Sequence, residues 1–186
     1  STFWFEITLL EIAAPGKPVE RPARVIIGLE GDAPTVLVVD DDQTNRAVLV
    51  RLLTPLGFQV LEAANGHEAL TLAVRQRPDL IITDLRMPEM DGVTLIRRLQ
   101  QTPELAAMPV IVTSASAYAS DRERSLTAGS QAFLSKPLDL DLLLDTLQQV
   151  LNLTWRCQTP ANASAAAANA TEWLLPPAAT LKALQA

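Results

Sequence analysis

Apolar and polar residues follow a repeating order along the middle of the chain. From Thr35 to about Leu153, short apolar runs rich in β-branched residues alternate with longer segments whose apolar residues recur at helical spacing. The short runs predict strands at Val36–Val39, Gln59–Glu62, Leu80–Thr83, Val110–Thr113 and Ala132–Leu134. The longer segments predict helices near Asn45–Leu56, Gly66–Arg75, Val93–Gln101, Asp121–Ala128 and Leu140–Leu151.

The predicted strands have no polar face, so other elements must cover both of their sides. Strands that alternate with helices along a chain form parallel sheets with crossover helices. We therefore expect an α/β fold, with a doubly wound five-stranded parallel sheet and helices on both faces.

The two flanks of this region have a different character. Residues 1–12 alternate loosely between apolar and polar and predict one strand, whereas residues 13–33 are rich in Pro and Gly and predict a linker, with at most a short strand at Arg24–Ile27. Residues 154–186 are rich in Ala and predict a mobile tail, with a short helix at its end. The expected division is thus a remnant strand at 1–12, a linker at 13–33, one domain at 34–153 and a tail at 154–186.

Composition narrows the class of protein. The 186 residues include 21 acidic and 15 basic side chains, and Lys and Arg form no cluster. We therefore expect no nucleic-acid contact. No run of about 18 apolar residues or basic leader occurs, so we expect no membrane contact by this segment. The single cysteine, Cys157, suits a reducing compartment, and the predicted location is cytoplasmic.

Candidate chemistry collects at one edge of the predicted sheet. Functional groups in open parallel sheets lie beyond the carboxyl ends of the strands, where Asp40, Asp41, Asp84, Thr113 and Lys136 fall. Neighbouring carboxylates repel each other, and a divalent ion such as Mg²⁺ would compensate and bridge them to a phosphate. Lysine and hydroxyl groups can then stabilise the phosphate oxygens. The predicted reaction is phosphoryl transfer to a carboxylate.

Four segments carry a resemblance to a known family. VLVVDDDQTNR, PDLIITDLRMPEMDG, VIVTSASA and FLSKPL, in this order, resemble the signatures of response-regulator receiver domains from Pro34 to about Leu153. The resemblance implies the flavodoxin-like strand order 2-1-3-4-5, a role in a two-component phosphorelay, and Mg²⁺ or Mn²⁺ as cofactor. A histidine kinase or a histidine phosphotransfer domain would donate the phosphoryl group.

The resemblance also implies roles for single residues. Asp84 would be the phosphoacceptor, and Asp40 and Asp41 the metal-binding acids, with Asp41 the direct ligand and Asp40 acting partly through water. Arg86 would give its backbone carbonyl to the metal, and Lys136 would pair with the phosphoryl group.

A switch is implied as well. The family couples a hydroxyl residue after the fourth strand to an aromatic residue on the fifth, which are taken here as Thr113 and Phe133. Phenylalanine has no hydroxyl, so rotation of the ring remains possible but a phenolic hydrogen bond does not. The resemblance further implies a cis bond between Lys136 and Pro137.

The first residues carry a second resemblance. STFWFEI is similar to the final strand of a histidine-kinase ATP-binding domain. Followed by a linker and a receiver, it implies the C-terminal half of a hybrid histidine kinase of the cyanobacterial type. This chain lacks the glycine-rich nucleotide segments and the phosphorylatable-histidine helix, so we expect no kinase activity from it alone. The strand predicted at 1–12 has unpaired backbone groups and could pair with its own copy in a second chain, so a homodimer is one alternative.

Other interpretations remain open. The segment from Asp40 to Thr44 also satisfies the D-x-D-x-T pattern of haloacid-dehalogenase-type phosphatases, with Asp40 as nucleophile and Asp42 as acid. That alternative leaves Asp84 and the following MPEMDG segment unexplained. A receiver that serves only as a docking module would lack pocket residues, and none is missing here. His67 receives no functional role.

Overall fold

A five-stranded parallel sheet forms the centre of the molecule. The computed structural model describes residues 25–116 and 118–158. The strands of the central sheet are β2 (Thr35–Val39), β3 (Gln59–Ala63), β4 (Leu80–Asp84), β5 (Val110–Ser114) and β6 (Ala132–Ser135). They lie in the order β3-β2-β4-β5-β6, all parallel. This confirms the predicted doubly wound sheet with flavodoxin-like order 2-1-3-4-5.

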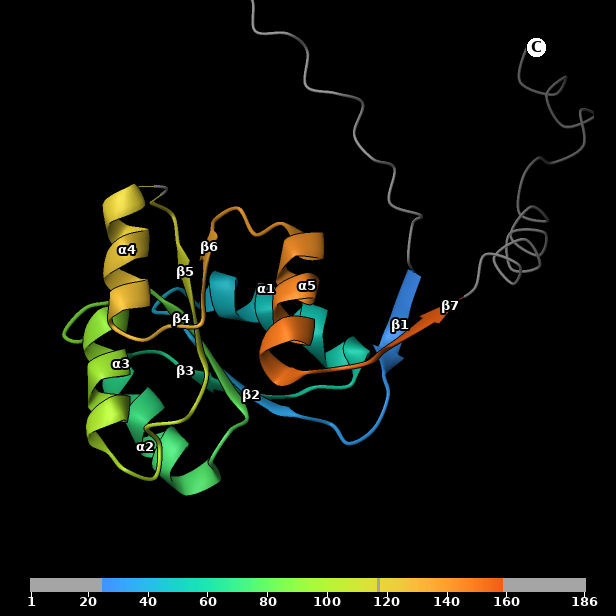
Figure 1. Cartoon of the computed structure of the whole chain (residues 1–186), viewed down its shortest axis with the longest axis horizontal. Helices are drawn as coiled ribbons and strands as arrows, with labels where there is room; N and C mark the ends of the chain where they lie inside the picture. Colours follow the sequence, from blue (N-terminus) through green and yellow to red (C-terminus); the bar gives the residue numbers. More distant parts are fainter. Residues whose placement is uncertain (1–24, 117, 159–186) are drawn as a thin grey trace, which may run out of the picture.

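Helices cover both faces of this sheet. They are α1 (Gln43–Leu53), α2 (Gly66–Gln76), α3 (Gly92–Gln101), α4 (Ala119–Thr127) and α5 (Leu140–Leu151). Buried residues of α2 and α3 form one core with one face of the sheet, and those of α1 and α5 form a second core on the other face. Figure 1 shows α2, α3 and α4 on one side of the strands and α1 and α5 on the other.

The ends of the first helix follow from two residues. The Asp42 carboxylate accepts a hydrogen bond from the Thr44 amide at 2.7 Å and caps α1, and this bond lowers the pKa of Asp42. The helix predicted to run to Leu56 ends at Leu53. Because Pro55 has no amide hydrogen to continue the α-helical ladder, residues Thr54–Leu56 form a 3₁₀ turn, η1.

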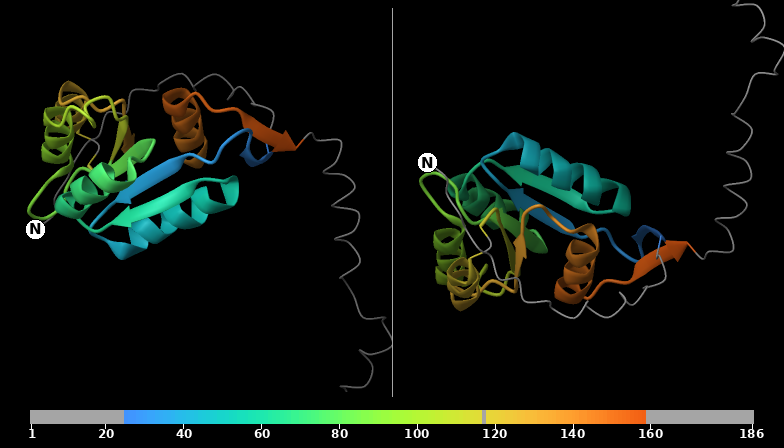
Figure 2. Two further views of the ribbon diagram at one scale, coloured as in Figure 1. Left: turned by 90° about the horizontal axis from the view of Figure 1, so that it is seen from below. Right: turned by 90° about the horizontal axis from the view of Figure 1, so that it is seen from above.

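Two further strands lie outside the predicted domain boundaries. β1 (Val25–Leu29) and β7 (Trp155–Gln158) pair antiparallel as a separate two-stranded sheet, the terminal ribbon. In both views of Figure 2 the ribbon lies at the end of the molecule where the coloured chain begins and ends. The sequence analysis placed these residues in a linker, with at most a short strand at Arg24–Ile27, and in a tail. It did not predict β7 or the pairing of the two strands.

Packing explains why the terminal ribbon forms. The Trp155 ring meets Phe58 edge-on, with ring centroids 6.1 Å apart. Leu29 of β1 and Trp155 of β7 both pack against the core of α1 and α5. Apolar contact with a preformed core stabilises a two-stranded sheet that would be marginal alone.

Some predictions lie outside the described residues. These are the strand at 1–12, most of the linker at 13–33, and the tail and short helix beyond residue 158. Among the residues that the structure describes, no helix is long and apolar enough to cross a membrane.

Trp155→Ala tests whether the terminal ribbon is part of the folded domain. We expect the substitution to lower the free energy of unfolding by about 1–2 kcal/mol, less than for a fully buried tryptophan because Trp155 is half-buried. Urea unfolding measures the change. Arg156→Ala, on the same strand but exposed, should change stability by less than about 0.5 kcal/mol. Equal stability of the wild type and Trp155→Ala would contradict a structural role for the ribbon.

Candidate functional site at the carboxyl edge of the sheet

Two buried carboxylates and one lysine meet where the central strands end. Asp40 follows β2 and Asp84 ends β4, which is the neighbouring strand. Asp40 is 3% exposed and Asp84 is 7% exposed. Lys136, which follows β6, places its Nζ 2.7 Å from Asp40 Oδ2 and 2.5 Å from Asp84 Oδ1. The structure therefore brings together these three residues from the predicted set.

The Lys136 ammonium is held in its charged form. Burial of the side chain lowers its pKa, but the hydrogen bonds to Asp40 and Asp84 outweigh burial and raise the pKa of Lys136 above its usual value. One positive charge thus separates two carboxylates that would otherwise repel each other.

The other oxygen of each carboxylate is held by the residues that follow it in the chain. Asp84 Oδ2 accepts a hydrogen bond from the Arg86 amide at 2.7 Å. Asp40 Oδ1 accepts from the Asp42 amide at 2.9 Å and from Asn45 Nδ2 at 3.2 Å. Both side chains are therefore fixed in orientation before any ligand arrives.

The loop after Asp84 is packed closely against the end of β4. A Cβ atom at Gly92 would lie 2.5 Å from the Asp84 carbonyl oxygen, so only glycine fits there. Met87 and Met90 are buried, and Met90 lies against Gly66 of α2. The predicted cis bond between Lys136 and Pro137 is present.

The structure separates Thr113 from Phe133. Thr113 pairs with Leu134, whose side chain belongs to the core of α1 and α5, and its hydroxyl donates to the Thr83 carbonyl at 3.3 Å. Phe133 pairs with Val112 and packs in the other core. Because side chains alternate along a strand, Ser114 lies on the face of Phe133 and Thr113 does not.

Ser114 is the hydroxyl residue of β5 that lies on the face of Phe133, and the sequence analysis did not single it out. It is 1% exposed, and its carbonyl accepts the Lys136 amide at 2.7 Å. Its hydroxyl accepts a hydrogen bond from the Ser116 amide at 3.0 Å. Along β5, Val110, Val112 and Ser114 share one face, and Ile111 and Thr113 share the other. Because Val112 pairs with Phe133, this alternation places Ser114 on the face of Phe133.

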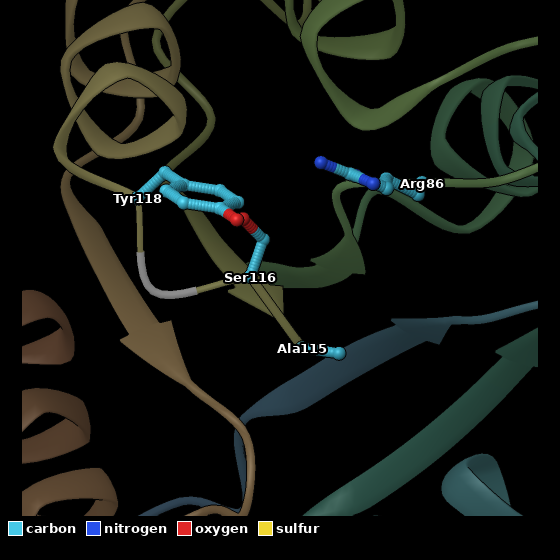
Figure 3. Close-up of a pocket in the computed structure, with 4 residues that line it drawn as sticks. All are labelled: Arg86, Ala115, Ser116 and Tyr118. Carbon is cyan, nitrogen blue, oxygen red and sulfur yellow. The ribbon is translucent and has the colours of Figure 1, made fainter. Parts of the chain in front are cut away.

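Arg86 links the acceptor loop to α4. Its Nη2 lies 3.1 Å from Asp121 Oδ2, in the first turn of that helix. Arg86 also lines an open pocket of about 490 Å³ with Ala115, Ser116 and Tyr118. Figure 3 shows the Arg86 side chain on one side of this pocket and Tyr118 on the other.

The donor set at this edge suits a hard cation, although it is not a complete metal site. Within residues 25–116 and 118–158, no group of three or more His, Cys, Asp or Glu side chains is arranged to hold a metal ion. Asp40, Asp84, the exposed Asp41 and the Arg86 carbonyl offer oxygen ligands. Mg²⁺ needs only one or two carboxylates and keeps several waters, so these residues fit it by the chemistry of their donors.

The chain is similar to known proteins over most of its described residues. The sequence matches the family model described as response regulator receiver domain over residues 36–148. The sensor protein EvgS of Escherichia coli K12 is 40% identical over 147 residues, which are 78% of this chain and 12% of EvgS. The chain therefore spans about an eighth of that relative. The response regulator DivK of Brucella anthropi is 34% identical over 63% of this chain and 95% of its own length.

Solved structures agree with these sequence matches. One is the receiver domain of the sensor histidine kinase PA1611 from Pseudomonas aeruginosa, whose structure has a magnesium ion coordinated in the active site cleft. It superposes with a TM-score of 0.60 and 33% sequence identity over 64% of this chain and 98% of that domain. A putative response regulator from Chloroflexus aurantiacus gives a TM-score of 0.63, with 32% identity over 65% of this chain and 99% of its own.

Replacing Lys136 tests the lysine bridge. In metal-free protein at pH 7, Lys136→Met should cost about 1–3 kcal/mol, because two buried carboxylates lose their partner while solvent screens part of the effect. The folded pKa is raised, so the bridge stabilises fully below the usual value of 10.5 and is lost as pH rises through the raised value. Urea unfolding measured over a range of pH should give free energies for the wild type and Lys136→Met that converge as the pH rises through the raised pKa of Lys136.

A surface ion pair gives the matched control for this measurement. Arg77 Nη2 lies 2.7 Å from Glu104 Oε2, and both side chains are well exposed. Arg77→Met should therefore cost less than about 1 kcal/mol at pH 7. A similar cost for both variants would show that Lys136 contributes no more than a surface pair.

Proposed function

This chain belongs to the response regulator receiver domain family of two-component systems, and we propose that Asp84 is the residue it uses to take up a phosphoryl group. The single observation that carries the proposal is the Lys136 bridge. Of the two carboxylates bound to Lys136, Asp84 ends its strand, and Asp40 is held by one donor from its loop and one from α1. The family match gives no support to the phosphatase alternative with Asp40 as nucleophile.

The proposed reaction uses the groups at the carboxyl edge. A carboxylate oxygen of Asp84 attacks phosphorus and forms a P–O bond, while the bond from phosphorus to the donor breaks and its electron pair leaves with the donor. Lys136, now bound to Asp84, would move its hydrogen bond to a phosphoryl oxygen. The pKa raised by the two carboxylates keeps it charged for this task.

A divalent cation completes the proposed site. Asp40, Asp41 and Asp84 with the Arg86 carbonyl would hold Mg²⁺, or Mn²⁺ in its place. The bound ion would supply charge neutralisation for the incoming phosphoryl oxygens. The magnesium ion in the PA1611 receiver structure supports this part of the proposal.

The family supports a proposal for the partner and for the parent protein. Receivers of this family work with histidine kinases or phosphotransfer proteins, so a phosphohistidine of such a protein is the proposed donor. Because relatives such as EvgS and RcsC are sensor proteins of which this chain matches 12%, we propose a hybrid histidine kinase as the parent. The segment itself is proposed to carry no kinase activity.

The switch would use Ser114 in place of Thr113. A phosphoryl group adds about −1.5 to −2 charges and three acceptor oxygens beside Lys136. Ser114 lies at the end of β5, next to the Lys136 amide and on the face of Phe133. Movement of its hydroxyl toward the phosphoryl group would change the surroundings of Phe133 and of α4.

Asp84→Asn tests the acceptor. The amide keeps the shape of the side chain but cannot act as nucleophile, so we expect no mass increase with acetyl phosphate and Mg²⁺. Asp79→Asn is the matched control, since Asp79 lies at the opposite edge of the sheet, where it accepts from the Thr35 amide. Labelling kept in Asp84→Asn but lost in Asp40→Asn would contradict the proposal and favour the phosphatase alternative.

A pair of variants tests the switch. Hydrogen exchange of residues 119–134, with and without the phosphoryl mimic beryllofluoride, should change in the wild type and in Thr113→Val. The change should be largely lost in Ser114→Ala, although Asp84 still accepts phosphate. A response kept by Ser114→Ala and lost by Thr113→Val would return the switch to Thr113.

A further inference from the structure

The direction of Asp41 depends on its backbone. Asp41 is exposed, and among the described residues its carboxylate has no hydrogen-bond or ion-pair partner. Asp40, by contrast, is held by Lys136, by Asn45 and by the Asp42 amide. The peptide units around Asp41 therefore set the direction of its Cα–Cβ bond, and with it the region that its carboxylate can reach.

Arg46 is the side chain that holds those peptide units. Its Nη1 donates to the Asp40 carbonyl at 2.7 Å and reaches the Asp41 carbonyl at 3.5 Å. Helical side chains lean toward the N-terminus of their helix, so this residue near the start of α1 covers the loop before it.

Glu62 fixes Arg46 in turn. Arg46 Nε lies 3.3 Å from Glu62 Oε2 on β3, and the Arg46 side chain is only 14% exposed. The planar guanidinium can serve the loop carbonyls and the Glu62 carboxylate at once, which a lysine ammonium cannot do in the same geometry. The β2–α1 loop is thereby tied to the neighbouring strand of the sheet.

We propose that Arg46, anchored by Glu62, is a positioning residue that holds Asp41 in the direction needed to bind the divalent cation. The inference rests on the proposed metal-dependent uptake at Asp84. Groups that orient metal ligands without touching the metal typically change its affinity by about 10- to 100-fold when they are removed.

The sign of the effect separates this role from simple electrostatics. Arg46 is a positive charge near a cation site, so its charge alone weakens Mg²⁺ binding, and removing the charge would strengthen it. A positioning role predicts the opposite, because a loosened loop lets Asp41 turn away from the ion. Arg46→Gln therefore gives a result whose direction distinguishes the two roles.

Calorimetric titration of the full chain with Mg²⁺ is the test. We expect Arg46→Gln to bind Mg²⁺ about tenfold more weakly, and Arg46→Lys, which keeps the charge but loses the planar fork, to be nearly as weak. Glu62→Gln keeps Arg46 but removes its anchor and should show a smaller loss of the same sign. Arg51→Gln, in the exposed last turn of the same helix, is the control and should not weaken binding.

A kinetic readout complements the affinity. At saturating Mg²⁺ the rate of labelling by acetyl phosphate should recover in Arg46→Gln, so the change lies in the Mg²⁺ concentration required and not in the limiting rate. If Arg46→Gln does not fold by circular dichroism, Arg46→Lys carries the test, because it keeps the charge and electrostatics alone then predicts unchanged Mg²⁺ binding.

The outcomes separate this inference from the proposed function. Unchanged or tighter Mg²⁺ binding by Arg46→Gln, or full recovery by Arg46→Lys, would overturn the positioning role. Asp41→Asn tests the site itself: if it binds Mg²⁺ as tightly as the wild type, the metal assignment under the proposed function fails. Weak binding by both Asp41→Asn and Arg46→Gln supports both.

Discussion

The Lys136 ammonium between two buried carboxylates is the interaction on which the carboxyl edge of the sheet depends. Asp40 and Asp84 come from adjacent strands, and lysine reaches them from β6, two strands away from β4. Without that charge the two carboxylates would repel each other. The bridge therefore holds the proposed nucleophile beside its acidic neighbour.

Two arginines connect the loops of this edge to neighbouring elements. Arg46 is largely buried and ties the loop after β2 to β3 through Glu62. Arg86 is mostly exposed and ties the loop after β4 to Asp121 of α4. In the first contact the arginine is largely buried and its carboxylate partner is half-exposed, whereas in the second the arginine is exposed and the carboxylate is buried. Each arginine thus connects a loop of the carboxyl edge to a neighbouring element.

The sequence predicts the central fold well because its signals are local. The central strands β2, β4 and β5 are short β-branched runs, and three of the four motifs place Asp40, Asp84 and Lys136 at strand ends. Thr113 and Ser114 are adjacent hydroxyl residues, and only the alternation within β5 decides which one shares a face with Phe133. A short strand near β1 was allowed for, but β7 and its pairing with β1 were missed, because the ribbon is stabilised by Trp155 and Leu29 on a distant core. The contact from Arg46 to Glu62 joins residues of two elements, which local patterns do not specify.

The terminal ribbon has a mechanical consequence for the domain. Flanking chain meets the described domain at Val25 and Gln158, and these two residues are partners in the ribbon register. A force that draws the flanks apart would load the hydrogen bonds of the ribbon one pair at a time from its outer end, as in unzipping. The parallel strands of the central sheet would bear load only after the ribbon had opened. Tension from neighbouring segments would therefore be released at the ribbon before it reached Asp40, which lies at the far end of β2.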